Sequence, residues 1–474
     1  MLLAVKGWAQ RQLSLEDALA LATGTSEQVE VARAGARRAE ANVRQTESQG
    51  LPQIGGSASY SRALASQFEG VTESEPAPVI PPECTGPFDP DPTLPLEERV
   101  RLLEQRLACP QSSPFGGLDF SQLGFGAPNT WNVGLSFNWL LYTGGRVEEQ
   151  VRASEAVRDI ARTTVTSTNA QVRLDVTSAY FNAQLASELV LISEASLANS
   201  EETLRLTQVR EAAGAQAEFD VLQARVSRDN QRPLLIRRQS QRDLAFERLR
   251  TLLDLPSREP LVLTTPVHEA ADRAVDMNID VIERIPVQQA SDRVTAARHQ
   301  LNAARAQRMP TITATSQYGL VAFSDNLIPS LGAFRDNWTV GAALQIPIYT
   351  GGRITAEIDS ARADVQEAEA QLEQMIESAR LDAESALADL RAARATWEAT
   401  QGTVTQAERG YDIARLRYRE GVSIPLEVDN ARLQLEQARV NRAQAARDLW
   451  VAQTRVELLP FLPISGVPQQ GIIQ

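Results

Sequence analysis

The chain has 474 residues and a formal net charge of −13 at pH 7, and only 5% of its residues are aromatic. The surplus of acidic side chains, with no basic arm, argues against a nucleic-acid ligand, because the phosphate backbone of DNA or RNA is itself negative. The scarcity of aromatic residues favours long helices with shallow interfaces over a thick globular core.

No stretch of about 18 or more apolar residues occurs, so the sequence predicts no membrane-spanning helix, although the strands of a β-barrel would leave a much weaker signal. Residues 1–12 are interpreted as the remnant of a secretory signal or as an N-terminal extension. Small residues at Gly7 and Ala9 suit cleavage after Ala9, but the apolar part is too short for a complete signal peptide.

Residues 13–258 are predicted to form a first structural repeat of a helix, two strands and a long helical hairpin. The strands are expected at about 53–64 and 130–142, and the hairpin over 146–254. The second strand carries the clearer signal, because apolar side chains at alternate positions give it one apolar and one polar face. Those apolar residues are Trp131, Val133, Leu135, Phe137, Trp139 and Leu141. A soluble antiparallel sheet would show the same alternation as a membrane-crossing strand.

A proline-rich segment over residues 65–129 separates these two strands. It holds ten prolines between Pro76 and Pro114, together with the two cysteines of the chain, Cys84 and Cys109. This composition indicates an irregular loop and not a separate domain. In an oxidising compartment the two cysteines are expected to form a disulfide, and the alternative is a pair of free thiols.

The decisive feature of the sequence is an internal duplication. YTGGR at 142–146 recurs at 349–353, an offset of 207 residues (349 − 142), and WNVG at 131–134 is matched by WTVG at 338–341 with the same offset. The two copies align without a gap from Trp131 to Pro256 of the first copy, which chance does not explain.

The second repeat covers residues 259–463 and leaves 464–474 as a C-terminal tail. After a helix, its strands are expected at about 311–322 and 337–349 and its helical hairpin over 353–459. Along these helices, apolar or small residues recur at alternating spacings of three and four, which is the seam of a coiled coil. A second partial stripe implies a further partner. The hairpins are therefore expected to assemble side by side into an α-helical barrel.

Four strands per chain are too few to close a membrane barrel, because known barrels need at least about eight. An open sheet edge in lipid would leave backbone donors and acceptors without partners. If the strands cross a membrane, several chains must share one wall, and three chains would contribute twelve strands. The predicted fold class is thus mainly α, with duplicated coiled-coil helices in an α-barrel and four strands per protomer in a twelve-stranded trimeric β-barrel.

The order of these features resembles the TolC family of outer-membrane channels. The resemblance rests on the opening LSLEDALALA at 13–22, the Pro-X-Ile strand starts at 52–54 and 310–312, the duplicated YTGGR turn and the duplicated glycine-to-acid tip, and it covers nearly the whole chain apart from 70–125 and the tail. It implies a homotrimer in the outer membrane of a Gram-negative bacterium, in contact with outer-membrane lipid and extending through the periplasm. It also implies a periplasmic adaptor (membrane fusion protein) and an inner-membrane pump as partners in a tripartite efflux or type I secretion system.

The resemblance assigns roles to residues at the tips between the long helices. Glu427 and Asn430 match two positions of the periplasmic aperture, and three copies of Glu427 would form an acidic ring of the kind that makes narrow pores cation-selective. Asn430 stands where the family has a second acid, which weakens that expectation. Asp220 and Tyr418 match a pair that holds the tip shut.

Gly214 and Gly421 suit the two chain reversals at the tips, and with Arg417 and Arg419 they are candidate contacts for adaptor docking. The arginine that supports the latch in the family is replaced by Ser423 here, and Arg417 and Arg419 are its candidate substitutes. For each tip residue, a solvated charge or turn at a helix end is the alternative interpretation.

No constellation of residues points to an enzyme, a cofactor or a metal. The YTGGR turn lacks the glycine spacing and the Lys-Ser/Thr of a phosphate loop. His268 and His299 are far apart in sequence, with no cysteine near either. The competing interpretation of the whole chain is a secreted or periplasmic coiled-coil protein, structural or adhesive, without transport activity.

Overall fold

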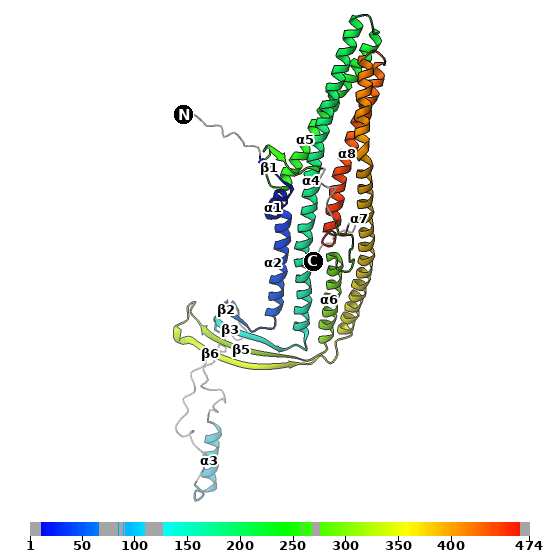
Figure 1. Ribbon diagram of the computed structural model, residues 1–474. Helices are drawn as coiled ribbons and strands as arrows, with labels where there is room; N and C mark the ends of the chain where they lie inside the picture. The colour runs from blue at the N-terminus through cyan, green and yellow to red at the C-terminus, as the bar shows by residue number, and fades with distance from the viewer. Residues whose placement is uncertain are drawn as a thin grey trace, which may run out of the picture. The chain divides into compact units, whose positions relative to one another are not determined.

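The computed structural model describes residues 11–65, 84, 89, 91–109, 127–257, 259–267 and 275–464 (Figure 1). Most of the interpreted signal remnant, His268 and nearly all of the C-terminal tail lie outside the described residues, as does much of the proline-rich segment. The chain divides into two compact units. The helical unit comprises the chain up to Glu47, Arg146–Arg305 and the chain from Thr350, and the sheet unit comprises Ser48–Gly145 and Ala306–Tyr349.

The helical unit is built around two long antiparallel hairpins, α4/α5 and α7/α8 (Figure 1). Its elements are β1 (Arg11–Leu13), α1 (Leu15–Thr25), α2 (Glu27–Ser48), α4 (Arg146–Ala212), α5 (Glu218–Leu252), β4 (Leu261–Leu263), α6 (Ile285–Ala306), α7 (Arg353–Arg419) and α8 (Pro425–Leu458). α4 and α7 have 67 residues each, which corresponds to about 100 Å at 1.5 Å per residue. α4 packs along both α5 and α8, so α5 and α7 are the outer helices of the four.

An aromatic cluster forms the centre of the core of the helical unit. Phe181 of α4 stacks on Trp450 of α8 with ring centroids 4.6 Å apart, and Tyr180 meets Phe181 edge-on at 5.3 Å. The Tyr180 hydroxyl donates to the carbonyl of Leu13 (2.9 Å) and accepts the N–H of Thr265 (3.0 Å). These bonds hold β1 and β4, a parallel two-stranded sheet, against the hairpins. Neither strand is predicted from the sequence.

A buried ion pair explains an interruption in the apolar seam of α7. The seam is broken by Asp382, and Arg284, which is fully buried, donates from Nη2 to its Oδ2 at 2.7 Å. The other nitrogens of Arg284 donate to the carbonyls of Ala379 (2.7 Å) and Leu459 (3.2 Å). Arg455 donates to the second oxygen of Asp382 at 3.0 Å. Together these bonds tie the start of α6 to α7 and to the end of α8.

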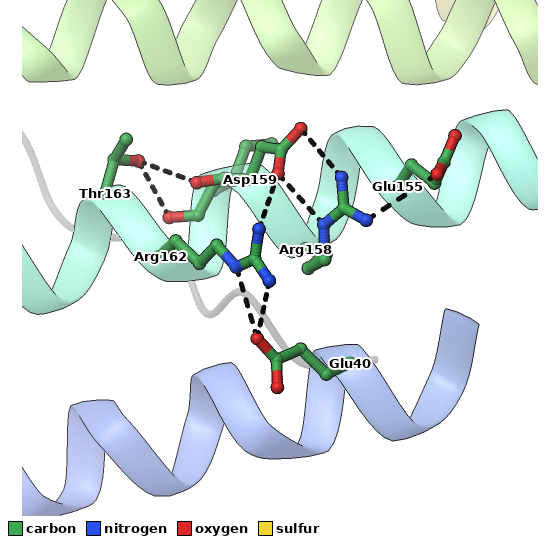
Figure 2. Close-up of polar contacts among 7 residues, drawn as sticks. Glu40, Glu155, Arg158, Asp159, Arg162 and Thr163 are labelled. Atoms are coloured by element: carbon green, nitrogen blue, oxygen red, sulfur yellow. Dashed lines mark hydrogen bonds and ion pairs between the residues drawn. The ribbon is translucent and has the colours of Figure 1, made fainter. Parts of the chain in front are cut away.

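Polar bridges connect α2 with α4 (Figure 2). Arg162 of α4 donates two hydrogen bonds to Glu40 of α2, at 2.7 and 3.2 Å. The Arg162 guanidinium lowers the pKa of Glu40. Along α4, Arg158 pairs with Asp159 at 3.0 Å and with Glu155 at 3.6 Å. Most of these side chains are substantially exposed, so the bridges set the position of α2 and contribute little to stability.

The sheet unit contains one four-stranded antiparallel sheet in the order β2-β3-β5-β6. Its elements are β2 (Gln53–Arg62), α3 (Leu96–Leu107), β3 (Asn129–Tyr142), β5 (Thr311–Ser324), η4 (Leu331–Ala333) and β6 (Phe334–Gln345). The strand expected over 337–349 was therefore misplaced at both ends. β6 ends at Gln345, before Pro347, which has no N–H to donate to a ladder. The strand begins at Phe334, earlier than predicted, because η4 leads directly into this residue.

The register of the ladder places most apolar residues on one face and most polar residues on the other, because partner residues lie on the same face of a sheet. One face carries Ile54, Ala58, Tyr60, Trp131, Val133, Leu135, Phe137, Trp139, Ile312, Tyr318, Leu320, Trp338, Val340 and Leu344. The opposite face carries Ser57, Ser59, Asn132, Ser136, Asn138, Thr313, Thr315, Gln317, Asn337 and Thr339. Five of the large apolar residues, Val133, Leu135, Trp338, Val340 and Leu344, are between 41% and 74% exposed. The separation is not complete, because Ser316 and Asp336 lie on the first face and Val321 and Phe323 on the second. The single chain thus leaves a largely apolar face uncovered.

The helix α3 lies within the segment expected to be an irregular loop, so that expectation is wrong for residues 96–107. Pro95 precedes its first turn, where the missing N–H of proline does not interrupt helical bonding. Cys84 and Cys109 form a disulfide, with the sulfur atoms 2.06 Å apart and the Cα atoms 6.0 Å apart. The disulfide ties the residue just beyond the end of α3 back to position 84.

Candidate functional site at the helical tips

Each long hairpin reverses at a short tip, residues 213–217 between α4 and α5 and residues 420–424 between α7 and α8. Gly214 and Gly421 have φ angles of +70° and +81°, which is the left-handed conformation that ends helices and that glycine adopts without strain. In each tip one backbone hydrogen bond closes the turn. The N–H of Ala215 donates to the carbonyl of Arg210, and the N–H of Val422 donates to the carbonyl of Arg417, both at 2.9 Å. The duplication of the sequence therefore extends to the geometry of the tips.

Tyr418 connects the two tips from a buried position. Its side chain is 1% exposed, and its hydroxyl lies 2.7 Å from Oγ1 of Thr207 on α4. Thr207 donates its own hydrogen to the carbonyl of Thr203 at 2.8 Å, so the tyrosine hydroxyl is the donor toward Thr207. Arg210 lies over the Tyr418 ring, 4.7 Å from the centroid, and donates to the carbonyl of Arg419 at 2.7 Å. These contacts join the last turns of α4 and α7.

The expected pair of Asp220 and Tyr418 does not form within the chain. Asp220 is half-buried and accepts a hydrogen bond from Gln216 at 2.8 Å, and no hydrogen bond joins it to Tyr418 among the described residues. The tyrosine hydroxyl is engaged by Thr207 instead. Ser423 has a buried hydroxyl oxygen without a partner in the described part of the chain.

The other predicted tip residues lie at the surface and form weak pairs. Glu427 bonds Arg417 at 3.1 Å, with 39% and 50% of the two side chains exposed, and Arg419 lies 3.7 Å from Glu202 of α4. Exposed pairs of this kind contribute about 0–1 kcal/mol. Asn430 is exposed. Neither arginine bonds Asp220, so their role as latch substitutes stays a prediction, as does the acidic ring.

A buried polar network, which was not predicted from the sequence, lies just behind the tips. Arg432 of α8 is 3% exposed and donates two bonds to Asp429 (2.8 and 3.0 Å) and one to Glu436 (3.1 Å). Ser196 of α4 accepts from Arg432 and donates to Glu436 at 2.6 Å. Ser227 of α5 donates to Asp429 at 2.8 Å. One arginine thus connects three helices.

Two titrating groups near the tips are perturbed. The hydrogen bond from Arg205 holds the pKa of Glu202 below its ordinary value, and the charge of Arg419 acts in the same direction. Burial raises the pKa of Tyr411, which lies two turns before Tyr418 on α7. The tyrosine therefore stays neutral and the carboxylate stays ionised at neutral pH.

A small cleft opens between the two hairpins next to this network. Its volume is about 20 Å³, close to that of one water molecule. It is lined by Ser200 and Thr203 of α4, Gln223, Ala224 and Ser227 of α5, and Pro425, Leu426 and Asp429 of α8. The hydroxyls of Ser200, Thr203 and Ser227 all donate hydrogen bonds within the chain, and the size of the cleft suits a water molecule.

Within the described residues, no group of three or more His, Cys, Asp or Glu side chains is arranged to hold a metal ion. His299 bonds Glu149 of α4 through Nδ1 at 2.8 Å and is half-buried between α6 and α4. None of the described helices is both long enough and apolar enough to cross a membrane.

Comparison with known proteins shows which proteins resemble this chain in sequence and in fold. The sequence profile of the family described as outer membrane efflux protein matches residues 111–254 and 282–459. Nodulation protein T of Rhizobium leguminosarum bv. viciae is 27% identical over 333 residues, which cover 68% of this chain and 67% of that protein. The solvent efflux pump outer membrane protein SrpC of Pseudomonas putida is 27% identical over 317 residues, which cover 64% of this chain and 65% of that protein.

The chain thus spans about two thirds of the length of these curated relatives. Its fold matches that of the outer membrane protein VceC from Vibrio cholerae, with a TM-score of 0.68 at 20% identity, over 94% of this chain and 96% of that one. Each of the two segments matched by the family profile contains a different long hairpin with its tip. The chain belongs to the outer membrane efflux protein family.

Proposed function

We propose that the chain is one protomer of a homotrimeric duct that exports substrates across the periplasm and the outer membrane. The observation that carries this proposal is the four-stranded sheet, which has one largely apolar face and, among the described residues, an unpaired strand at each edge. An exposed apolar face of this kind is compatible with lipid and poorly compatible with water. The polar opposite face would then line an aqueous channel.

The open edges call for further copies of the chain. In the described part of the chain, β2 and β6 each present one row of backbone N–H and C=O groups without a strand beside it. In the hydrocarbon of a bilayer each such group would be unsatisfied at a cost of several kcal/mol. Pairing β6 of one chain with β2 of the next satisfies both edges, and three chains would close a twelve-stranded barrel.

The outer helices support the same head-to-tail assembly. α5 exposes the apolar side chains Leu222 (49%), Val226 (59%), Ile236 (66%) and Leu244 (54%). α7 exposes Leu381 (70%), Ile413 (50%) and Leu416 (59%). Since α5 and α7 do not pack on each other among the described residues, each is available to a neighbouring chain. A heterologous contact of this kind closes into a ring when its rotation allows.

The tips of the two hairpins would form the periplasmic aperture of the duct. Three copies of Tyr418, each bonded to Thr207 and covered by Arg210, would hold the two hairpins of each chain together and keep the aperture narrow. Glu427 and Asn430 would face the aperture. The turns at Gly214 and Gly421, with Arg417 and Arg419, would receive a periplasmic adaptor that connects the duct to an inner-membrane pump.

The names of the relatives do not point to one cargo. Relatives are named as solvent and toluene efflux pump components, as the cation efflux system protein CusC and as the nodulation protein T. We therefore propose a tripartite efflux or type I secretion system without assigning a cargo, because the sheet and the tips carry no binding site specific to one substrate in the described part of the chain.

The proposal is tested by purification from outer membranes and by reconstitution. Heat-modifiable trimers and ion-conducting channels in planar bilayers are expected. A monomer that stays in water without detergent and does not conduct would refute the duct.

The latch is tested by Tyr418→Phe, which removes the bond to Thr207 and keeps the ring under Arg210. A buried neutral hydrogen bond contributes about 1 kcal/mol, so three copies opening together would change the closed-to-open ratio by about 3 kcal/mol, or roughly 100-fold. The single-channel conductance should therefore rise. Tyr411→Phe is the matched control, because its hydroxyl has no hydrogen bond to α4 among the described residues. Equal conductance in both variants would refute the latch.

A further inference from the structure

The helix α3 leaves a stripe of apolar side chains exposed, with no packing partner among the described residues. Leu96, Val100, Leu103 and Leu107 are 73%, 45%, 43% and 73% exposed, and no residue of the helix is buried. Their spacings are four, three and four, which places all four on one face of the helix. This is the pattern of a coiled-coil seam, in which Leu96 and Leu103 take the d positions and Val100 and Leu107 take the a positions.

The charges beside the stripe follow the same register. With these positions fixed, Arg99 occupies a g position and Glu104 occupies the following e position, five residues later. In a parallel coiled coil, the g residue of one helix lies beside the next e residue of its neighbour, and opposite charges there select the partner and the orientation. A second copy of α3 would bring Glu104 to Arg99.

The composition of α3 argues against an anionic lipid surface as the occupant. The helix carries three acidic residues, Glu97, Glu98 and Glu104, and three arginines, Arg99, Arg101 and Arg106. Helices that lie on anionic membranes have a basic polar face, whereas the polar residues of α3 sum to zero charge. Self-complementary charges at g and e fit another copy of the same helix better.

We propose that the α3 helices of the three protomers pack in parallel as a short three-stranded coiled coil. The inference rests on the proposed trimer, whose rotational symmetry would present three α3 helices in the same orientation. The a positions hold one valine and one leucine, a mixed set that does not by itself determine the number of helices in the coiled coil. The threefold symmetry of the proposed trimer determines this number instead.

The trimer and the disulfide also explain how so short a helix could associate. A free helix of 12 residues is marginal in water, and two such helices would not associate at ordinary protein concentrations. Attachment to one trimer raises their effective concentration to about the millimolar range. The Cys84–Cys109 disulfide, which spans 25 residues of sequence, further restricts the conformations of the segment that carries the helix.

The proposal is tested by placing single cysteines in the full chain and purifying it from outer membranes in detergent. Leu103→Cys puts the thiol in the seam, and Gln105→Cys puts it on the opposite face, at an f position of the same helix. Oxidation with copper phenanthroline should link two of the three chains of the Leu103→Cys trimer through residue 103, as identified by peptide mass. The Gln105→Cys trimer should stay unlinked.

A charge exchange provides the second test. Arg99→Glu in the Leu103→Cys background should reduce the linked fraction, and the added change Glu104→Arg should restore it, because the exchanged pair is again attractive. Rescue by exchange is not expected if Arg99→Glu merely unfolds the segment.

Native mass in the same detergent separates this inference from the proposed function. A trimer in which residues 103 and 105 link equally or not at all overturns the coiled coil and leaves the duct intact. A seam thiol that is protected from maleimide but does not link also overturns it, since something other than α3 then covers the stripe. Absence of the trimer overturns both proposals.

Discussion

Replacement of Arg284 tests whether the buried ion pair, and not apolar packing alone, holds the helical unit together. Arg284 is 0% exposed and donates to Asp382 and to the carbonyls of Ala379 and Leu459. Arg284→Met keeps most of the volume but leaves the Asp382 carboxylate, whose side chain is 6% exposed, with Arg455 as its remaining cation. Breaking one side of a buried pair costs about 3–5 kcal/mol, and the value for this site is expected at the lower end because Arg455 remains.

Hydrogen exchange of the purified trimer measures this loss locally. A change of about 3 kcal/mol corresponds to a roughly 100-fold faster opening, and it should be confined to the backbone amides of α7 around Asp382 and the end of α8. The double variant Arg284→Met with Asp382→Leu should recover most of the stability, because no uncompensated charge is left. Exchange rates in Arg284→Met within threefold of the wild type, about 0.6 kcal/mol, would refute the reasoning.

Two further predictions concern a turn and a pH dependence. Gly144 and Gly351 are equivalent residues of the duplicated turn, with φ angles of +66° and +60°. A methyl group on Gly144 would lie 2.3 Å from Cβ of Met309, whereas one on Gly351 meets nothing within 4 Å. Both alanine variants are therefore strained by about 1–2 kcal/mol, and Gly144→Ala should lower the yield of folded trimer clearly more than Gly351→Ala; equal yields would contradict the close approach. The hydrogen bond from His299 lowers the pKa of Glu149, so this carboxylate stabilises the fold above its ordinary pKa of 4.5 and loses that contribution as the pH falls below it. The stability difference between wild type and Glu149→Gln in thermal scans should shrink below that pH, and a difference that grows there would exclude this carboxylate as the cause.

Much of the fold follows from periodicity in the sequence. The alternation from Trp131 to Leu141 corresponds to β3, and the three-four spacing corresponds to the long helices, because a single buried face repeats over many residues in each case. β1 and β4 have three residues each and are too short for any period to be detected. They exist because Tyr180 bonds the backbone beside them, which is a tertiary effect. α3 was not predicted because it is a short helix inside a segment whose many prolines favour irregular structure.

The site was less predictable than the fold. The resemblance selected Tyr418, but its partner Thr207 is fixed by the axial position of α4 against α7, which no spacing within one helix reveals. Arg432 occurs in α8 among many other charges, and only its burial distinguishes it. Asp382 did leave a signal, since a carboxylate at an apolar seam position calls for a buried cation. A search for that cation would not have selected Arg284 from sequence, because it lies 98 residues away in a different segment.

The two unpaired edge strands carry a genetic consequence. If β6 of each subunit pairs with β2 of the next, a lesion in either strand damages a junction that it shares with a healthy neighbour. In a cell that makes normal and defective subunits in equal amounts, random mixing would leave only about one trimer in eight free of the lesion. Point mutations in β2 or β6 that preserve stable subunits should therefore be dominant, whereas mutations that cause the subunit to be degraded before assembly should be recessive.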